Sequence, residues 1–495
     1  MKSIKNYCFW FVTGSQHLYG EETLKQVELN SKIISEELNK STKANYKIIF
    51  KPILITPDSI TKLCVEANGD ENCAGIITWM HTFSPAKMWI NGLSILKKPL
   101  LHLHTQFNRD IPWNDIDMDF MNLNQSAHGD REYGFIVSRM KINRKVVVGY
   151  WKDESVINKI SQWMSVSVAF CDSKYMKIAR FGDNMREVAV TEGDKVEAQI
   201  KFGWSTNGYG VGELVRYIDN VSDDKVNNLL NDIKEKYEFP KNSKDKDVLN
   251  SIKDQVKIEI AMKEFFKDNN ISAFTTTFED LHGMKQLPGL AAQRLMEAGY
   301  GFGAEGDWKT AAMLRTMKIM ALENNKGTSF MEDYTYHFEP GNETVLGAHM
   351  LEVCPSIASN KPKIEVHPLS IGGKQDPARM VFDAKTGPAL NASLVDLGNR
   401  FRLIINEVES VKFENDMPKL PVARVLWKPK PSLSVAAQAW ILSGGAHHTV
   451  FSLDVTTEQL VDWADMSNIE YVIIDKDTKI MDLKKELRWN DLIWK

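Results

Sequence analysis

Four side chains that could bind a metal ion stand in segments of small or aromatic residues: Glu305, Glu332, His349 and His448. Their surroundings are GAEGDWKTAAMLR, SFMEDYTYHFE, GAHMLEVCPS and SGGAHHTVFS. Two carboxylates and two imidazoles suit a divalent cation of hard to borderline character, Mn²⁺ better than Zn²⁺. Carboxylates beside such a Lewis acid can also remove and return protons. The four residues therefore predict a metal-assisted proton-transfer site, provided that folding brings them together.

Two of these residues also have ordinary structural explanations. Glu332 is predicted on one face of a strand with Tyr334, Tyr336 and Phe338. A carboxylate is costly to bury there unless it is paired or bound to a metal, but on an edge strand it would face solvent. His349, between small and apolar residues, could equally be a hydrogen-bonded histidine of the core. Sequence alone leaves both alternatives open.

Glu305 lies in a loop between glycines, immediately before a predicted helix. Asp307 is a plausible N-cap for that helix. Glycines beside Glu305 would let the backbone approach an ion closely. The apolar stripe of the helix indicates core packing and not a cofactor site, and consists of Met313, Met317, Met320 and Ala321.

The histidine doublet, His447 and His448, follows two glycines. Consecutive side chains of an extended segment point to opposite faces, so the two imidazoles are not expected to bind one ion together. One should be a ligand, and the other should orient a partner or touch the substrate. His81 and His128 are predicted in loops with aromatic neighbours, where they could contact a polyhydroxylated ligand or simply lie at the surface.

The first hundred residues alternate strand and helix signals. Strands are predicted at FWFVTG, YKIIFKPILIT, CAGIITWM and KPLLHLH, with helical spacing between them. This order implies a doubly wound parallel sheet with helices on both faces. The loop after the first strand, GSQHLYGEE, lacks the GxGxxG spacing of a dinucleotide site. It does place Gln16, His17 and Tyr19 beyond the carboxyl end of a strand, where open sheets bind ligands.

Two further regions follow in the chain. From 177 the signals are mixed, with REVAVTEG and VEAQIKFGW predicted as strands ahead of a helix-rich segment, which indicates a central α/β domain. Later strands separated by PG, GGK and TGP turns predict an antiparallel barrel or sandwich. A closing helix is predicted from Thr456, with Gln459 completing a capping box. We therefore predict domains at 1–176, 177–326 and 327–495.

Composition excludes several classes of protein. A chain of 495 residues is too long for one core. Its formal net charge of -4 gives no basic surface for nucleic acid. No stretch is long enough to span a bilayer, and the apolar run near the N-terminus is too short for a signal peptide. Five cysteines without CxxC spacing suit reduced thiols. We predict a cytoplasmic protein that binds neither nucleic acid nor a membrane.

Several strings together resemble the L-arabinose isomerase family. They are spread over the whole chain in the family's order: WFVTGSQHLYGEETLKQV, NLNQSAHGDREYGFI, TTTFEDLHGMKQLPGLAAQRLMEAGYGFGAEGDWKTA, GAHMLEVCPSIA, WILSGGAHHTVFS and LRWND. The resemblance implies metal ligands at Glu305, Glu332, His349 and the second histidine of the doublet, His448. It also implies a three-domain protein with a β-barrel-like C-terminal domain, Mn²⁺ dependence and a homohexamer. The tail after Asp491 is shorter than in some members.

The resemblance further implies active sites shared between subunits. The N-terminal domain of a neighbouring subunit would complete each site with Gln16, Leu18, Gln125 and His128. His447 is predicted to contact the sugar within the chain that holds the metal. Nothing in composition or periodicity indicates this arrangement.

The predicted function is an aldose–ketose isomerase that interconverts L-arabinose and L-ribulose, the first step of L-arabinose catabolism. Mn²⁺, with Co²⁺ as a plausible substitute, would stabilise an enediolate of the open-chain sugar. Glu305 and Glu332 would divide the proton transfers, in an order that sequence leaves open. D-Galactose could be a second substrate, because it has the same configuration at the reacting carbons. The alternatives are a metal-dependent hydrolase and a non-catalytic sugar-binding protein.

Overall fold

The computed structural model describes residues 6–242, 245–321, 327–369 and 373–494. These residues form two compact units, whose border in the sequence lies between Cys171 and Asp172. The predicted domain border at 326 falls outside the described residues, and the three predicted domain ranges stay predictions. Within the described residues, no helix has the length and apolar character needed to cross a membrane.

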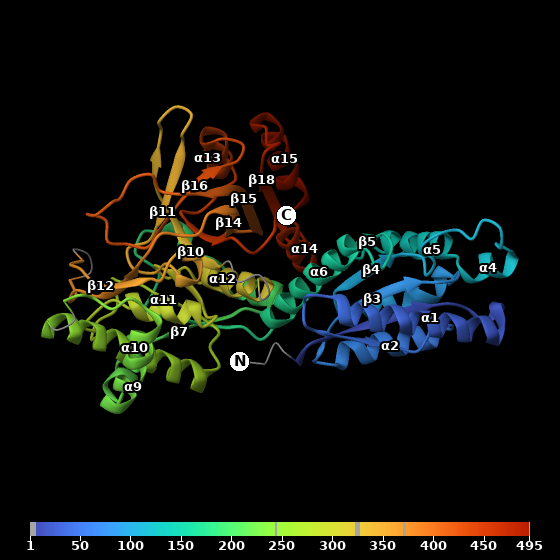
Figure 1. Cartoon of the computed structure of the whole chain (residues 1–495), viewed down its shortest axis with the longest axis horizontal. Helices are drawn as coiled ribbons and strands as arrows, with labels where there is room; N and C mark the ends of the chain where they lie inside the picture. The colour runs from blue at the N-terminus through green and yellow to red at the C-terminus, as the bar shows by residue number, and fades with distance from the viewer. Residues whose placement is uncertain (1–5, 243–244, 322–326, 370–372, 495) are drawn as a thin grey trace. The chain divides into compact units, whose positions relative to one another are not determined.

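The first unit is built on a five-stranded parallel sheet in the order β2-β1-β3-β4-β5 (Figure 1). Its strands are β1 (Cys8–Gly14), β2 (Lys47–Phe50), β3 (Cys73–Met80), β4 (Leu100–His104) and β5 (Lys145–Val148). The strand order reverses between β1 and β3, so the predicted doubly wound sheet is confirmed. Sheets of this kind bind ligands beyond the carboxyl ends of the strands at the reversal.

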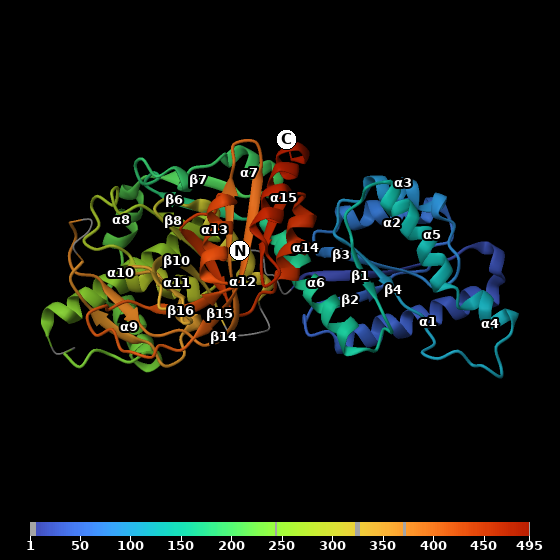
Figure 2. The same cartoon turned by 90° about the horizontal axis from the view of Figure 1, so that it is seen from above.

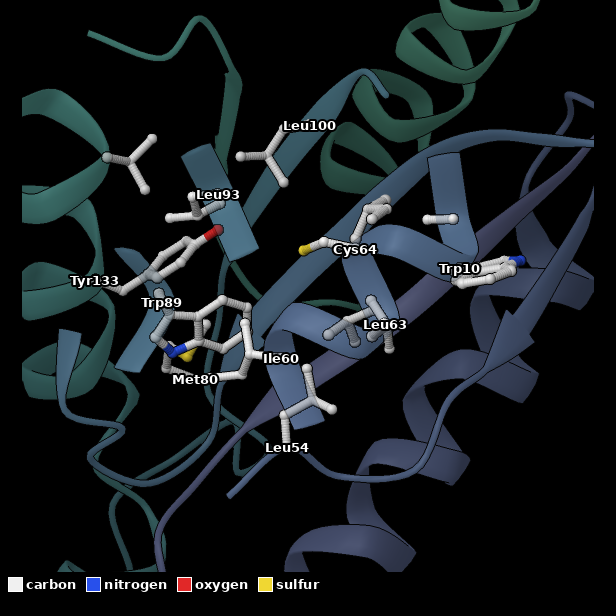
Figure 3. Packing of buried hydrophobic residues seen from close by; sticks show 14 of the residues in the cluster. Trp10, Leu54, Ile60, Leu63, Cys64, Met80, Trp89, Leu93, Leu100 and Tyr133 are labelled. Atoms are coloured by element: carbon white, nitrogen blue, oxygen red, sulfur yellow. The ribbon is translucent and has the colours of Figure 1, made fainter. Parts of the chain in front are cut away.

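Helices cover both faces of this sheet (Figure 2). One face carries α2 (Pro57–Gly69), α3 (Ile90–Ile95) and α5 (Ser126–Arg139), and the other carries α1 (Gly20–Ser41) and α6 (Glu154–Ser173). Alternate residues of β1 point to the two sides of the sheet. Trp10 (Figure 3) and Val12 join the core under α2 and α5, whereas Phe9 packs on Trp163 of α6. Burial on both faces explains why this strand is almost wholly apolar.

The second unit contains a four-stranded parallel sheet in the order β7-β6-β8-β9. Its strands are β6 (Lys177–Phe181), β7 (Ser205–Tyr209), β8 (Ala273–Thr276) and β9 (Gly301–Ala304). The helices of this region are α7 (Lys195–Phe202), α8 (Val211–Asp219), α9 (Asp223–Lys236), α10 (Lys246–Asn269), α11 (Gly289–Glu297) and α12 (Trp308–Met320). The predicted central α/β architecture is confirmed.

Two strands predicted in this region are wrong. REVAVTEG contains a short 3-10 turn at Ala189–Thr191, and VEAQIKFGW forms most of helix α7. The Asp194 carboxylate accepts hydrogen bonds from two backbone N–H groups of the first turn, and Gly203 ends the helix in the left-handed conformation. These two end signals outweigh the alternating apolar residues between them.

Six antiparallel strands of the second unit close into a barrel, in the ring order β14-β17-β10-β11-β16-β15 and back to β14 (Figure 1). They are β10 (Thr328–His337), β11 (Thr344–Ala348), β14 (Gly387–Asp396), β15 (Phe401–Val411), β16 (Arg424–Pro429) and β17 (His448–Ser452). The predicted β-barrel is therefore confirmed. The remaining strands are β18 (Glu470–Ile474), parallel to β15, and the pair β12 (Lys363–Val366) and β13 (Ala378–Val381).

Helices α13 (Leu433–Leu442) and α15 (Ile480–Ile493) share a core with barrel strands β14 and β15 and with β18. Helix α14 (Thr457–Ser467) has Thr456 as its N-cap and Gln459 in the reciprocal capping position, as predicted. Helix α12 contacts both β9 of the parallel sheet and the barrel strands β10, β14 and β17. Because it is covered on all sides, its burial extends beyond the predicted stripe to every residue from 308 to 317.

Candidate active site

Neighbouring barrel strands bring Glu332, His349 and His448 together. Glu332 of β10 pairs with Ala348 of β11 on one side and with His448 of β17 on the other. His349 directly follows Ala348. Its Nε2 lies 3.9 Å from Glu332 Oε2, and its ring centre lies 6.3 Å from that of His448. Strand register thus joins three positions that are far apart in the sequence.

Glu305 reaches the same group from the parallel sheet, because it directly follows β9. Its Oε2 lies 3.7 Å from Nε2 of His448 and 3.5 Å from Nε2 of His447. Glu305 has a φ of 59°, in the left-handed region that residues other than glycine rarely adopt. Such backbone conformations persist only where surrounding contacts impose them, and they are enriched at functional sites.

Asn184 supplies part of that constraint. The carbonyl of Glu305 accepts a hydrogen bond from the Met185 N–H at 3.0 Å. A Cβ on Gly306 would lie 2.5 Å from the Cα of Asn184, so only glycine fits there. Asn184 is buried, with its amide donating to Thr191 O at 2.6 Å and its oxygen accepting from Arg180 at 2.6 Å. The loop is therefore held from the β6 side of the sheet.

Two carboxylates orient the histidine rings. His448 Nδ1 lies 3.1 Å from Asp307 Oδ2, and His349 Nδ1 lies 2.6 Å from Glu352 Oε2. In both rings Nε2 faces the group formed by Glu305 and Glu332. A carboxylate on one imidazole nitrogen fixes the ring and leaves the other nitrogen available as a metal ligand.

Two observations indicate that this group of side chains fits a cation. His448 Nε2 is a buried nitrogen without a hydrogen-bond partner among the described residues. Its nearest acidic oxygen, on Glu305, is 3.7 Å away, which is too far for a hydrogen bond but suits two ligands of one ion. Two carboxylates and two imidazoles are also the donor types that Mn²⁺ accepts. Glu305, Glu332, His349 and His448 are therefore able to hold a divalent metal.

The carboxylates and imidazoles of this group stabilise one another's charged forms. The pKa of Glu305 is lowered, chiefly by the hydrogen bond from His447, which together with His448 outweighs burial. Burial alone would lower the pKa of His349, but contact with Glu352 and the nearby Glu332 and Glu305 raise it above its usual value. Glu305 is therefore ionised at neutral pH, as binding of a cation requires.

Asp307 is kept charged although it is buried. Burial acts to raise its pKa, but Lys309, His448 and Thr310 overcome this and lower it well below the usual range. Lys309 is itself buried, with its ammonium donating to the carbonyls of Val190 and Glu192 and lying 3.5 Å from Asp307. The negative charge behind His448 is thus fixed by the fold.

A cavity of about 240 Å³ opens next to these residues. Glu305, Glu332 and His349 form its polar side, and Glu352 lies beside them. Its walls are mostly apolar and include Met185, Phe278, Leu287, Pro288, Tyr334 and Leu351. A small cavity with a few convergent polar groups on apolar walls is typical of a site for a small ligand.

Three family models match consecutive stretches of the chain. The L-arabinose isomerase N-terminal domain matches residues 3–175, the central domain 177–323 and the C-terminal domain 327–470. L-Arabinose isomerase from Geobacillus stearothermophilus is 65% identical over 100% of both chains. The chain belongs to the L-arabinose isomerase family. The predicted family, and with it the prediction of an isomerase, is confirmed.

Other members of the L-arabinose isomerase family match equally completely. The enzymes from Thermotoga petrophila and Bacillus subtilis strain 168 are 61% and 60% identical, over 100% of this chain and 99% of theirs. Among solved structures, the glucose-galactose binding protein GanP from Geobacillus stearothermophilus aligns with a TM-score of 0.15 and 11% identity, over 64% of this chain and 92% of that one. A likeness that low supports no argument about fold or function.

Two details of the predicted site are wrong. His447 precedes β17, which begins at His448, so strand alternation does not separate the doublet. The two ring centres lie 4.2 Å apart, and both Nε2 atoms approach Glu305. The rings differ in exposure instead: the side chain of His447 is 38% exposed and that of His448 is 0% exposed. Their predicted roles, as sugar contact and metal ligand, stay predictions.

The second wrong detail is the face of Tyr336. A β-bulge between Asp333 and Thr335 changes the alternation of β10. Glu332 and Tyr334 line the cavity of the candidate site, whereas Asp333 and Tyr336 line a separate small pocket at the barrel. Burial and then the charge of Glu332 raise the pKa of Asp333 to about 7. Ordinary alternation separates Glu332 from Asp333, and the bulge after Asp333 puts Tyr336 on the side of Asp333.

The predicted sugar-binding residues of the N-terminal region lie close to one another in the first unit. Gln16 precedes a 3-10 turn (His17–Tyr19) in which Leu18 is 81% exposed. Gln125 accepts a hydrogen bond from Tyr19 at 3.0 Å, which joins that turn to the start of α5. His128 is exposed on α5, with its ring 4.9 Å from that of Phe83. The role of these residues at a site shared between subunits stays a prediction.

The predicted loop position of His128 is wrong, whereas that of His81 is confirmed. His128 belongs to helix α5. His81 follows β3 but is fully buried, stacked on Trp79 at 4.5 Å and 2.8 Å from the Asn30 amide. Burial lowers its pKa to about 4. His81 is a core histidine, the ordinary outcome for an imidazole next to apolar strands.

Proposed function

We propose that this protein is a divalent-metal-dependent aldose–ketose isomerase that interconverts L-arabinose and L-ribulose. Relatives named L-arabinose isomerase at 60–65% identity over their full length support the substrate. The observation that supports the metal most strongly is the buried, unpartnered Nε2 of His448 facing Glu305. We further propose Mn²⁺ as the ion, with Co²⁺ as a substitute, and Glu305, Glu332, His349 and His448 as its ligands.

A bound divalent cation would supply Lewis acidity toward the carbonyl and hydroxyl oxygens of the open-chain sugar. The chain itself would supply the proton transfers. Glu305 and Glu332 face the cavity from different structural elements: Glu305 from the loop after β9, and Glu332 from barrel strand β10. One carboxylate would remove the proton from C2 of the aldose and return it to C1, and the other would move the hydroxyl proton between the two oxygens. The apolar walls would keep bulk water from the reacting carbons.

His447 has a distinct place in this proposal. Its hydrogen bond to Glu305 is the largest influence on the pKa of that carboxylate, and Glu305 in turn raises the pKa of His447. A half-exposed imidazole in this position would orient Glu305, touch a sugar hydroxyl and pass protons between them. We also propose activity toward D-galactose, a role at the start of L-arabinose catabolism, a cytoplasmic location and a homohexamer with sites shared through Gln16, Leu18, Gln125 and His128.

Removal of metal tests the proposal directly. Protein stripped with EDTA is expected to form no L-ribulose from L-arabinose, and added Mn²⁺ or Co²⁺ is expected to restore ketose formation. Full turnover in demonstrably metal-free protein would contradict the proposed metal requirement, but not the proposed isomerase activity. Sugar binding without ketose formation, whichever divalent metal is added, would favour the alternative of a non-catalytic sugar-binding protein. Cleavage of a hydrolysable sugar derivative would favour the alternative of a metal-dependent hydrolase.

The doublet gives an asymmetric test. His448→Ala is expected to reduce bound Mn²⁺ sharply, because His448 is buried and anchored by Asp307. His447→Ala is expected to keep the metal and to lower kcat or raise KM, since this more exposed ring contacts Glu305. Metal per chain by mass spectrometry, together with kcat and KM, separates the two. Equal loss of Mn²⁺ in both folded variants would show that both histidines are ligands.

A further inference from the structure

The first unit contains a second group of metal-binding side chains, His102, His104 and Asp130. The two histidines lie two residues apart on β4, so both point to the face of the sheet that α5 covers. Asp130 faces them from α5. His102 Nε2 lies 2.9 Å from Asp130 Oδ1, and His104 Nδ1 lies 2.9 Å from Asp130 Oδ2. One donor atom of each residue lies within 4.8 Å of the other two.

Packing fixes these three groups in place. The side chains of His102 and Asp130 are 5% and 1% exposed. The Met80 N–H donates to Asp130 Oδ1 at 3.1 Å, and the Tyr133 ring lies at right angles to His102, 5.0 Å between centres. Met80 and Tyr133 belong to the core shown in Figure 3. A site held by its surroundings loses little conformational freedom when a ligand binds.

The spacing of the donors suits a transition metal. Bonds of about 2.0–2.2 Å to nitrogen and oxygen place neighbouring donors roughly 3.0–3.5 Å apart, so the two nitrogen–oxygen distances of 2.9 Å need only a slight expansion. Imidazole and carboxylate together favour Zn²⁺, Co²⁺ or Ni²⁺ over Mg²⁺ and Ca²⁺, which prefer oxygen alone. His104 is 26% exposed, which gives an ion an entry path and leaves room for water as a further ligand.

We propose that His102, His104 and Asp130 form a second divalent-cation site, separate from the one at Glu305 and independent of the proposed function. An ion there would tie β4 to α5, the helix that presents His128. It would replace the two hydrogen bonds between the histidines and Asp130, and each neutral imidazole would bind through a nitrogen whose proton has moved to the other ring nitrogen. Binding to the folded state alone would raise the thermal stability of the first unit.

Counting Zn²⁺ ions per chain tests this proposal in the full-length protein. After chelation, reconstitution with Zn²⁺ and gel filtration, the unsubstituted protein is expected to hold two ions per chain. His104→Gln and His102→Gln are each expected to hold one, because glutamine keeps a hydrogen-bond donor for Asp130 but is a poor ligand. His367→Gln is the matched control, since His367 pairs with a single carboxylate, Glu365, at 2.7 Å. It should leave both ions bound.

A second pair of variants separates the two sites. His349→Ala should lose only the ion of the candidate active site, and Zn²⁺ should still raise its thermal midpoint. His349→Ala with His104→Gln should bind no Zn²⁺ and show no midpoint shift. If His104→Gln and His102→Gln, both folded by circular dichroism, bind as much Zn²⁺ as the unsubstituted protein, the proposal is overturned and the three groups form a hydrogen-bonded pairing only. If the candidate active site does not bind a metal, His349→Ala should hold the same number of Zn²⁺ ions per chain as the unsubstituted protein, which is a separate outcome.

Discussion

Glu305→Gln and Glu332→Gln are each expected to lower kcat by about 10²–10⁴-fold, the usual contribution of general acid–base catalysis. Glutamine keeps the size of the side chain but can neither accept the C2 proton nor add a negative charge to a cation site. For Glu305 the loss also affects both histidines, because its Oε2 faces Nε2 of His447 and of His448. The effect should therefore exceed that of removing a single hydrogen bond.

The measurement is kcat and KM at saturating Mn²⁺, with metal content and circular dichroism recorded for each variant. Glu339→Gln is a suitable control, because Glu339 lies beyond the end of β10 with its side chain 63% exposed. Its kcat should stay unchanged. Near-normal kcat in Glu305→Gln or Glu332→Gln would remove that residue from the proton transfers.

Asp307→Asn and Glu352→Gln are expected to weaken Mn²⁺ binding by about 10–100-fold, the usual effect of removing a group that orients a ligand. Each substitution removes the charge behind one imidazole, Asp307 for His448 and Glu352 for His349. Asparagine is chosen at 307 because Asp307 is also the N-cap of α12, accepting from the Thr310 N–H. Asparagine caps helices about as well as aspartate, so the helix should be retained.

Metal titration of activity distinguishes positioning from catalysis. If Asp307 and Glu352 act through the histidines, high Mn²⁺ should return most of the lost turnover while the apparent Kd for Mn²⁺ stays raised. Thermal midpoints without metal should fall in Asp307→Asn, because the buried Lys309 ammonium loses the carboxylate 3.5 Å away. A kcat that stays low at saturating Mn²⁺, with an unchanged Kd, would instead mean that these carboxylates take part in the reaction.

Much of the fold could be predicted because local signals agree with the tertiary structure. The buried run of β1 and the Pro57 start of α2 indicate alternating strands and helices, and the capping residues Asp307 and Thr456 lie where the helices begin. Helix α7 was missed because its apolar residues also suit a strand, and only the end signals at Asp194 and Gly203 distinguish the two.

The candidate site was harder to predict, since its parts meet through sheet register and not through spacing. Nothing local to Glu332 and His448 shows that they are paired across β10 and β17. The residue types and the family strings indicate the four proposed ligands, but not the carboxylates that orient the two histidines. The sequence indicates Asp307 only as a helix cap, and the one signal for Glu352 is its His-x-x-Glu spacing from His349.

Local irregularities account for the remaining errors. His447 lies one residue before β17, so the alternation of side chains along a strand does not govern the doublet. The bulge in β10 turns Tyr336 away from the cavity that Tyr334 lines. A bulge or the first residue of a strand depends on partners that lie far away in the chain, which a single segment does not contain.

The most direct test of the central claim is an anomalous difference map from crystals of the protein grown with Mn²⁺ and recorded at the manganese absorption edge. The account predicts a peak bounded by Glu305, Glu332, Nε2 of His349 and Nε2 of His448, with Nδ1 of each ring still facing its carboxylate. A peak that is not bound by Glu332 or by His349 would contradict the account. So would the absence of a peak there in crystals that convert L-arabinose to L-ribulose.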